Sequence, residues 1–341
     1  MNSKANKLKL YLPIALAAIF ITATLRCIAC LINLNYKTGY FEEKILINIA
    51  GYLTVGFCIL FLTYPFVTER GKKLVAQFAS PQAYVPTGLV AVSLVFLSFN
   101  LLISSAAKGG SSISSALAVV LGLLGLVSIG YFVLNAFITS PPSSIRAAFG
   151  ICTVAFLALY AAFLYFDTAA PLNAPNKIVD QMAFLLSALF FLYETRISLC
   201  RGKWSLYSTF GMIAATLCAY SSIPSLITYI VKGNTISNSV YESLFIFTAF
   251  IFTTSRLIMS LGYNEDREHE CVTLMRAHIE KRQEEIDENE SVRKQAYLEM
   301  LGKLSADEEE FEEEIYEEIS IPEEAYPEEL EGESDITENY D

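Results

Sequence analysis

The sequence predicts an all-α membrane protein: a multi-pass bundle of about eight transmembrane helices, then a C-terminal cytoplasmic helix and an acidic, largely disordered tail. Three observations lead to this fold class. Hydrophobic residues make up 53% of the 341 residues, and the mean hydropathy is +0.42. Apolar runs of about 20 residues recur, which is the length that a helix needs to cross roughly 30 Å of hydrocarbon. Acidic residues concentrate at the end of the chain, because residues 265–341 hold 29 of the 36.

The expected spans follow the apolar runs. Basic residues precede the first run, and proline- or glycine-containing links separate several of the others, as is typical of helix ends. The spans are expected at about 11–34, 45–67, 87–106, 115–139, 145–166, 178–199, 204–231 and 239–261. The transmembrane bundle then covers residues 1–263, a charged helical extension covers 264–304, and the acidic tail covers 305–341.

The distribution of Lys and Arg between the spans predicts the orientation of the bundle. If the N-terminus is cytoplasmic, the segments on that side collect ten Lys and Arg residues and the outer loops collect five. Cytoplasmic loops of membrane proteins carry such an excess of basic residues. Because an even number of spans returns the chain to its starting side, both termini are expected in the cytoplasm, most simply at the plasma membrane of a bacterium.

Ionisable residues inside the expected spans are the first candidates for function. We single out Arg26, Asp180, Glu194, Arg196 and Arg256. An unpaired charge in a membrane costs at least about 2.5–3.5 kcal/mol on insertion scales, so each is expected to pair or to reach the interface. Arg26 and Asp180 lie at similar depths, as do Glu194 and Arg256. Two interpretations stay open: ion pairs that hold the first, sixth and eighth spans together, or an ion- or proton-coupled pathway.

The seventh span carries Pro224 within a run of serines. Proline removes one backbone hydrogen bond of a helix, and neighbouring serines can bond to the groups that it frees. The sequence therefore predicts a helix kink at Pro224. Such a kink is compatible with a ligand cavity in a transporter and with an ordinary bend.

The spans contain no residues that suggest catalysis. Both histidines, His269 and His278, follow the last expected span, and no span holds a His-Glu-x-x-His motif or a Gly-rich phosphate loop. We therefore expect no catalytic residues, no metal site, no cofactor and no enzymatic activity. No nucleic-acid partner is expected either.

The helical extension after the last span shows a weak heptad pattern. Val272, Ile279, Ile286 and Met300 share one heptad position, but polar residues interrupt the seam. The pattern indicates either a weak coiled coil or a solvated charged helix that needs no partner.

The acidic tail contains a short amphipathic segment. Residues 307–341 hold 18 carboxylates and no Lys or Arg, a composition that predicts disorder until a partner binds. Within this tail, Phe311, Ile315 and Ile319 fall on one helical face. This stripe predicts docking to a cytoplasmic protein that offers an apolar groove with a basic rim.

These features leave two function classes open. The first is a non-enzymatic membrane scaffold or signalling component that recruits a cytoplasmic partner through its acidic tail. The alternative is a small-molecule or ion-coupled transporter that uses Asp180 and Glu194. Apart from the lipid bilayer, the sequence identifies no partner by name, and it leaves the oligomeric state open.

Overall fold

The fold is an all-α membrane bundle, as the sequence predicts. The computed structural model describes residues 3–35, 40–67, 73–74, 84–107, 113–137, 144–166, 174–198, 202–233, 236, 239–261, 281 and 284–300. Eight helices in these ranges are long and apolar enough to cross a membrane. They are α1 (Ser3–Asn33), α2 (Ile45–Leu62, with the short α3, Tyr64–Val67, continuing its span), α4 (Tyr84–Ala107), α5 (Ile113–Phe137), α6 (Ser144–Phe166), α7 (Pro175–Ser198), α8 (Trp204–Lys232) and α9 (Val240–Leu261).

Each predicted span coincides with one of these helices, and differences are confined to the ends. Helix α7 begins at Pro175, three residues before the expected start at Ile178. Proline suits the first helical position because its fixed φ fits the helix and its missing N–H would have no partner there. Between α2 and α3, the Thr63 hydroxyl donates to the Leu60 carbonyl at 2.6 Å, where the backbone makes a turn.

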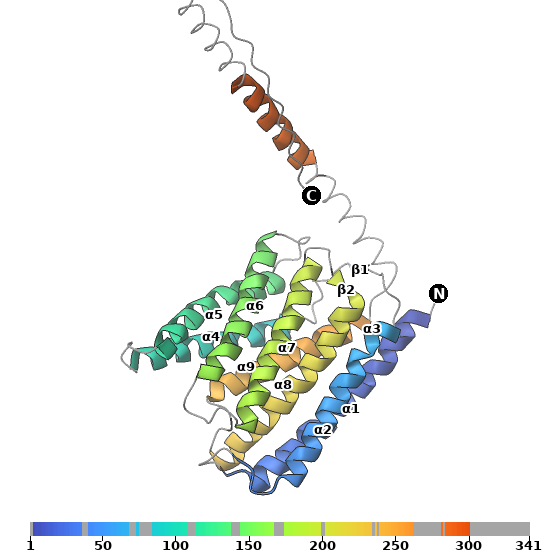
Figure 1. The fold of residues 1–341 in the computed structure, drawn as a ribbon, viewed down its shortest axis with the longest axis vertical. Helices are drawn as coiled ribbons and strands as arrows, with labels where there is room; N and C mark the ends of the chain where they lie inside the picture. The colour runs from blue at the N-terminus through green and yellow to red at the C-terminus, as the bar shows by residue number, and fades with distance from the viewer. Residues whose placement is uncertain are drawn as a thin grey trace, which may run out of the picture. The chain divides into compact units, whose positions relative to one another are not determined.

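By their contacts, helices α4 to α9 form a closed ring. Figure 1 shows these helices packed together, with α1 and α2 at one edge of the bundle. Each of these helices packs against the next one in the chain, and α9 returns to pack against α4. Helix α1 lies outside the ring against α8, and α2 packs on α1 and reaches α8. As a result, α8 is the most buried of the eight membrane-spanning helices and α2 is the least buried.

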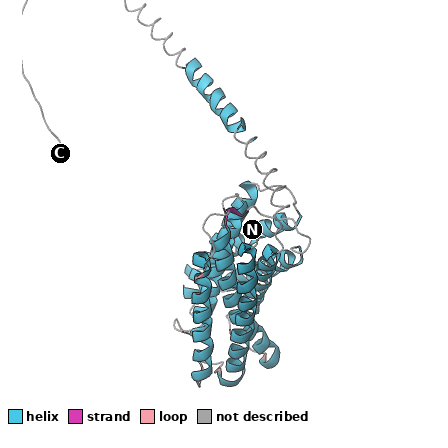
Figure 2. Ribbon diagram, turned by 90° about the vertical axis from the view of Figure 1, so that its right-hand side faces the viewer, coloured by secondary structure: helices cyan, strands magenta, loops and turns pink. Residues whose placement is uncertain are grey.

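Successive spanning helices run in opposite directions, which gives the bundle two distinct ends. We call the end where α1 begins the proximal end, and the end where α1 finishes the distal end. At the proximal end, strand β1 (Lys73–Leu74) pairs antiparallel with β2 (Gly202–Lys203), joining the segments that precede α4 and α8 (Figure 2). At the distal end, Leu34 forms an isolated antiparallel bridge with Phe41 between α1 and α2.

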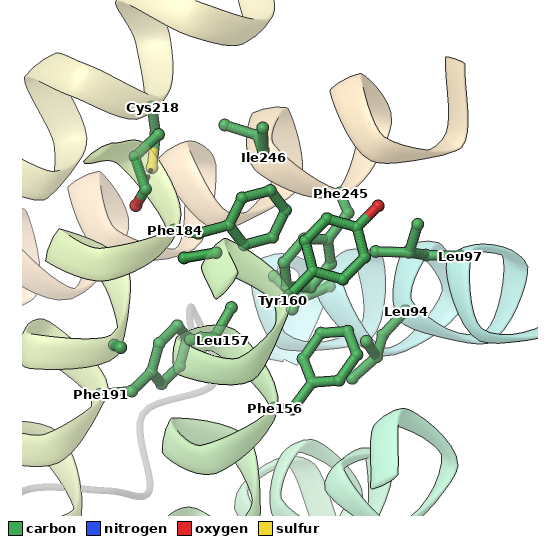
Figure 3. Close-up of a cluster of buried hydrophobic side chains, with 14 of the residues drawn as sticks. Leu94, Leu97, Phe156, Leu157, Tyr160, Phe184, Phe191, Cys218, Phe245 and Ile246 are labelled. Atoms are coloured by element: carbon green, nitrogen blue, oxygen red, sulfur yellow. Dashed lines mark hydrogen bonds between the residues drawn. The ribbon is translucent and has the colours of Figure 1, made fainter. Parts of the chain in front are cut away.

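The centre of the ring is filled with aromatic side chains (Figure 3). Tyr160 of α6 lies 4.4 Å from Phe184 of α7, and Phe184 stacks on Phe245 of α9 at 5.9 Å, measured between ring centroids. Closer to the proximal end, Phe191 of α7 stacks on Phe252 of α9 at 5.4 Å. These rings are buried, so the middle of the ring is a packed apolar core.

Close contact between α6 and α7 depends on a glycine. A Cβ atom built on Gly150 of α6 would clash with the Thr195 hydroxyl of α7 and lie 2.9 Å from its Cγ2. We therefore expect Gly150→Ala to separate these helices and to lower the free energy of unfolding by about 1–3 kcal/mol. Thermal and denaturant unfolding of the purified protein in detergent measure the loss.

Gly56→Ala in α2 is the matched control, because nothing lies within 4 Å of a Cβ at that position. It removes a helix-interior glycine without a clash, so stability should stay the same or rise slightly. Equal losses in the two variants would show that the close contact at Gly150 is unimportant.

The C-terminal part of the chain forms a second unit, from Arg276 to Asp341. Residues 284–300 are helical, and all of their side chains are exposed. Ile286 and Met300, two members of the predicted heptad seam, are 47% and 61% exposed. The helix predicted for the extension is therefore present over these residues. Nothing in the described part of the chain buries its apolar side chains.

Candidate functional site

Buried polar side chains gather in two places, one toward each end of the bundle. We call them the distal cluster (Arg26, Asn176, Asp180, Tyr220 and Ser221) and the proximal cluster (Tyr131, Asn135, Arg146, Glu194, Tyr207 and Arg256).

The distal cluster joins α1, α7 and α8 through the Arg26 guanidinium, which is 1% exposed. Its Nη2 donates to Asn176 Oδ1 at 2.8 Å, and its Nη1 donates to the Tyr220 carbonyl at 2.8 Å. The guanidinium carbon lies 4.4 Å from the centroid of the Tyr220 ring. Next to these groups, the Ser221 hydroxyl donates to the Asp180 carboxylate. One arginine of α1 therefore binds to both α7 and α8.

Pro224 explains why the Tyr220 carbonyl can accept a hydrogen bond from Arg26. In a regular helix, the N–H of residue 224 would donate to the carbonyl of residue 220. Proline has no N–H, so the Tyr220 carbonyl loses its helical donor. The Arg26 guanidinium takes the place of that donor. Pro224 lies inside α8, which continues to Lys232.

The sequence analysis placed Arg26 and Asp180 at the same depth, and the structure brings them into one cluster. The contacts of Arg26 are with Asn176, one turn before Asp180 on α7, and with the backbone of α8. Sequence reasoning missed Asn176, because it lies in the first turn of α7, ahead of the expected span. The sequence offered one signal for it: a polar residue directly after Pro175, where a helix can start.

Glu242 is a second buried acid near the distal end that the sequence analysis did not single out. It lies in the first turn of α9, is 1% exposed, and accepts a hydrogen bond from the Tyr160 hydroxyl of α6 at 3.4 Å. Beside it, the Ser243 and Ser225 hydroxyls bond to each other at 2.7 Å across α8 and α9. These contacts join α9 to α6 and to α8 near the distal end.

Two lysines cap helix C-termini at the distal end. Lys177 Nζ donates to the Tyr165 carbonyl in the last turn of α6 at 3.4 Å, and Lys232 Nζ donates to the Leu31 carbonyl in the last turn of α1 at 2.5 Å. Carbonyl groups in the last turn of a helix have no helical donor, and a lysine there also favours the negative end of the helix dipole. Their positions therefore have a structural reason.

The proximal cluster is built on the ion pair of Arg256 with Glu194, which the sequence predicts from their matching depths. Arg256 Nε donates to Glu194 Oε1 at 2.7 Å, and Nη2 bonds to the same oxygen. The two side chains are 9% and 1% exposed. Tyr207 of α8 and Tyr131 of α5 both interact electrostatically with this pair. The pair thus links α7 to α9 in the interior of the ring.

Arg146 and Asn135 complete the proximal cluster, and sequence reasoning missed both. Arg146 lies in the first turn of α6, where the sequence analysis used it only for the orientation of the bundle, and it is 1% exposed. It interacts electrostatically with Tyr131 and with Arg256. Asn135 is 9% exposed and lies one helical turn from Tyr131.

Arg196 stands apart from both clusters. It is exposed in the last turn of α7, and its guanidinium carbon lies 5.7 Å from the centroid of the Tyr193 ring. This geometry is that of an arginine at the edge of the bundle, stacked on an aromatic side chain of its own helix.

Apolar packing separates the two clusters. Asp180 and Glu194 are 14 residues apart on α7, a rise of about 21 Å along the helix. Between them, Phe184 and Phe191 are buried in the aromatic core (Figure 3). The clusters are therefore two local contacts between helices, with packed aromatic rings between them.

In the described ranges, no three His, Cys, Asp or Glu side chains gather closely enough to hold a metal ion.

The predicted docking residues of the tail, Phe311, Ile315 and Ile319, lie outside the described residues.

Comparisons with known proteins give no assignment. No family model, curated protein or solved structure matches this chain.

Proposed function

We propose that the protein is a non-enzymatic membrane scaffold or signalling component, whose C-terminal segment recruits a cytoplasmic partner. The observation that carries this proposal is the contrast between the two units. In the bundle, the buried charges Arg26, Glu194 and Arg256 are engaged in contacts that join helices. In the C-terminal unit, residues 284–300 expose apolar side chains on a charged helix. Under this proposal, that helix offers a surface outside the membrane that can engage another protein.

The partner proposed for the tail is a cytoplasmic protein with an apolar groove and a basic rim. Phe311, Ile315 and Ile319 would fill the groove, and the carboxylates around them would speed encounter with the basic rim. An isolated helix of this length is marginal in water, so docking would supply the burial that the helix lacks alone. Residues 284–300 would extend the contact, as a coiled coil or as a solvated spacer.

The tail proposal predicts that partner capture depends on three apolar side chains. Full-length protein in detergent should retain a bound cytoplasmic protein, whereas the triple variant Phe311→Ala, Ile315→Ala and Ile319→Ala should lose at least tenfold of it. Quantitative mass spectrometry after affinity capture measures the ratio. The matched control is Tyr326→Ala with Leu330→Ala, which removes apolar side chains beyond Pro322 and should retain the partner. Equal capture by wild type and the triple variant would contradict the proposal.

The orientation proposed for the bundle places both termini in the cytoplasm, with the bundle in the plasma membrane of a bacterium. The excess of basic residues at the proximal end supports it. The outer loops contain five lysines, and two of them, Lys177 and Lys232, cap helices. Because helix capping explains the positions of these two lysines, they count less against the proposed orientation than the other basic residues of the outer loops.

Cysteine labelling tests this orientation. In a variant that retains Cys271 alone, a membrane-impermeant maleimide should leave the tail unmodified in intact cells and modify it after permeabilisation. Ser111→Cys and Asn234→Cys, each in a cysteine-free background, should be modified in intact cells. Labelling of Cys271 in intact cells would place the tail outside.

A transporter is the alternative, and the composition of α8 favours it. This most buried helix carries buried hydroxyl side chains along its length: Ser208, Thr209, Thr216, Ser221, Ser222, Ser225 and Thr228. Helices of this kind can line a substrate pathway, with Asp180 and Glu194 as its ionisable groups. Loss of substrate flux in a fully folded Asp180→Asn protein would favour transport over a structural role.

A further inference from the structure

The antiparallel pair of β1 and β2 places two lysines directly opposite each other at the proximal end. In its register, Lys73 pairs with Lys203 and Leu74 pairs with Gly202. Directly opposite residues of an antiparallel pair are close neighbours, and like charges in this position are destabilising. The lysine pair is therefore unfavourable on its own, and an anion that contacts both ammonium groups would offset the repulsion.

Basic residues also predominate around this pair. Residues 69–73 and 201–203 hold five Lys and Arg against one acid, Glu69. Arg196 is exposed in the last turn of α7, and α7 contacts β2. Among the described residues, the exposed Lys203 side chain forms no hydrogen bond or ion pair, and the first turn of α8 contains no acid. The described part of the chain therefore supplies no carboxylate that neutralises Lys203.

The positions of the neighbouring spans place the lysine pair at the level of the lipid headgroups. The span that precedes β1 ends at Val67, and Phe66 beside it is 79% exposed on the lipid-facing side of a membrane helix. The span that follows β2 begins at Ser205, directly after Lys203 and Trp204. Residues just beyond the ends of two spans lie where hydrocarbon gives way to headgroups. Lysines at this level attract the negative phosphates of anionic lipids.

We propose that this lysine pair binds the phosphate of an anionic phospholipid, such as phosphatidylglycerol, in the leaflet at the proximal end. Both ammonium groups are donors, and one phosphate has enough acceptor oxygens for the two of them. An acidic polypeptide could also supply negative charge, but the place of the pair beside two spans favours lipid. The proposal does not depend on the tail partner, because Lys73 and Lys203 belong to the membrane unit, Met1–Met275.

Lipid binding by the full-length protein tests the proposal. Purified protein in detergent is titrated with phosphatidylglycerol or with phosphatidylcholine, and native mass spectrometry measures the bound lipid. The double variant Lys73→Gln and Lys203→Gln should bind phosphatidylglycerol about tenfold more weakly than wild type, because it removes two cations that attract the headgroup. The double variant Lys73→Arg and Lys203→Arg keeps both charges and should bind like wild type. Phosphatidylcholine should bind equally weakly to all three proteins.

Lys44→Gln with Lys108→Gln is the matched control. Lys44 precedes α2 and Lys108 follows α4, so this variant removes the same charge at the distal end. It should bind phosphatidylglycerol with at least half of the wild-type affinity, about the change expected from weak long-range attraction alone. Equal affinities of wild type and the Lys73→Gln, Lys203→Gln protein, or equal losses in the two double variants, would overturn the proposal.

Thermal unfolding in lipid nanodiscs gives a second readout. In phosphatidylcholine alone, the Lys73→Gln, Lys203→Gln protein should unfold at the same temperature as wild type or higher, because the repulsion is removed. Adding phosphatidylglycerol should raise the midpoint of wild type and leave that of the variant nearly unchanged. Displacement of phosphatidylglycerol by inorganic phosphate would indicate a site for free phosphate. Loss of a bound acidic protein from the variant, with lipid binding intact, would indicate a polypeptide, and either result would overturn the proposal.

Discussion

Arg256→Leu should cause a loss of about 3–5 kcal/mol in the free energy of unfolding. The variant leaves the Glu194 carboxylate, which is 1% exposed, without the guanidinium that donates to it. A buried charge without its partner is costly, because neither water nor lipid replaces the lost hydrogen bonds. Chemical unfolding in detergent, or the yield of folded protein from membranes, measures the loss.

Arg196→Leu provides the control for this variant. It removes an arginine from the same end of the bundle, but one that is exposed and stacked on Tyr193. Its loss should stay below about 1 kcal/mol. If both substitutions had the same effect, the burial of the ion pair would not explain the result.

Arg26→Leu should destabilise the distal end by about 3 kcal/mol or more, since two hydrogen bonds from a charged group are each worth about 1.5–3 kcal/mol. The variant leaves Asn176 Oδ1 and the Tyr220 carbonyl without the donors that the guanidinium supplies. The thermal unfolding midpoint of the purified protein measures the effect.

A second substitution tests the link between Arg26 and Pro224. Pro224→Ala restores a backbone N–H four residues after Tyr220, and this group can donate to the carbonyl that Arg26→Leu leaves unsatisfied. Pro224→Ala should therefore stabilise the Arg26→Leu protein by about 1 kcal/mol more than it stabilises wild type. The same change in both backgrounds would mean that Arg26 does not replace the missing helical donor.

The sequence predicts the spans of this protein well, because every helix that crosses a membrane must be long and apolar. It also predicts the contact between Glu194 and Arg256, since residues at equal depth in a small bundle have few alternative partners. Hydropathy does not show which helices are neighbours. Lipid-facing and helix-facing positions are both apolar, so the ring of α4 to α9 is not evident from composition.

Three of the missed residues share one property: they lie in the first turn of a helix. Asn176 precedes its expected span, whereas Arg146 and Glu242 lie at the start of theirs and were not singled out, because a polar residue normally marks the end of a span. In the structure, neighbouring helices cover these turns and bury all three side chains. Whether a terminal turn is covered depends on the packing of other helices, which local sequence does not encode.

The role of Pro224 was only half predictable. The sequence shows that one carbonyl of the seventh span must lose its donor, and nearby serines were the expected replacements. Instead, an arginine from the first span reaches the Tyr220 carbonyl, a contact between residues 194 positions apart. Such a contact depends on α1 packing against α8, which only the three-dimensional arrangement reveals.

The central claim is that the buried charges hold the helices together, and a double-mutant cycle on Glu194 and Arg256 tests it most directly. The free energy of unfolding is measured for wild type, Glu194→Gln, Arg256→Gln and the double variant. Because the two groups bond directly, the double variant should be less destabilised than the sum of the single variants, with a coupling energy above about 1.5 kcal/mol. Additive losses, or single variants that unfold like wild type, would contradict the claim.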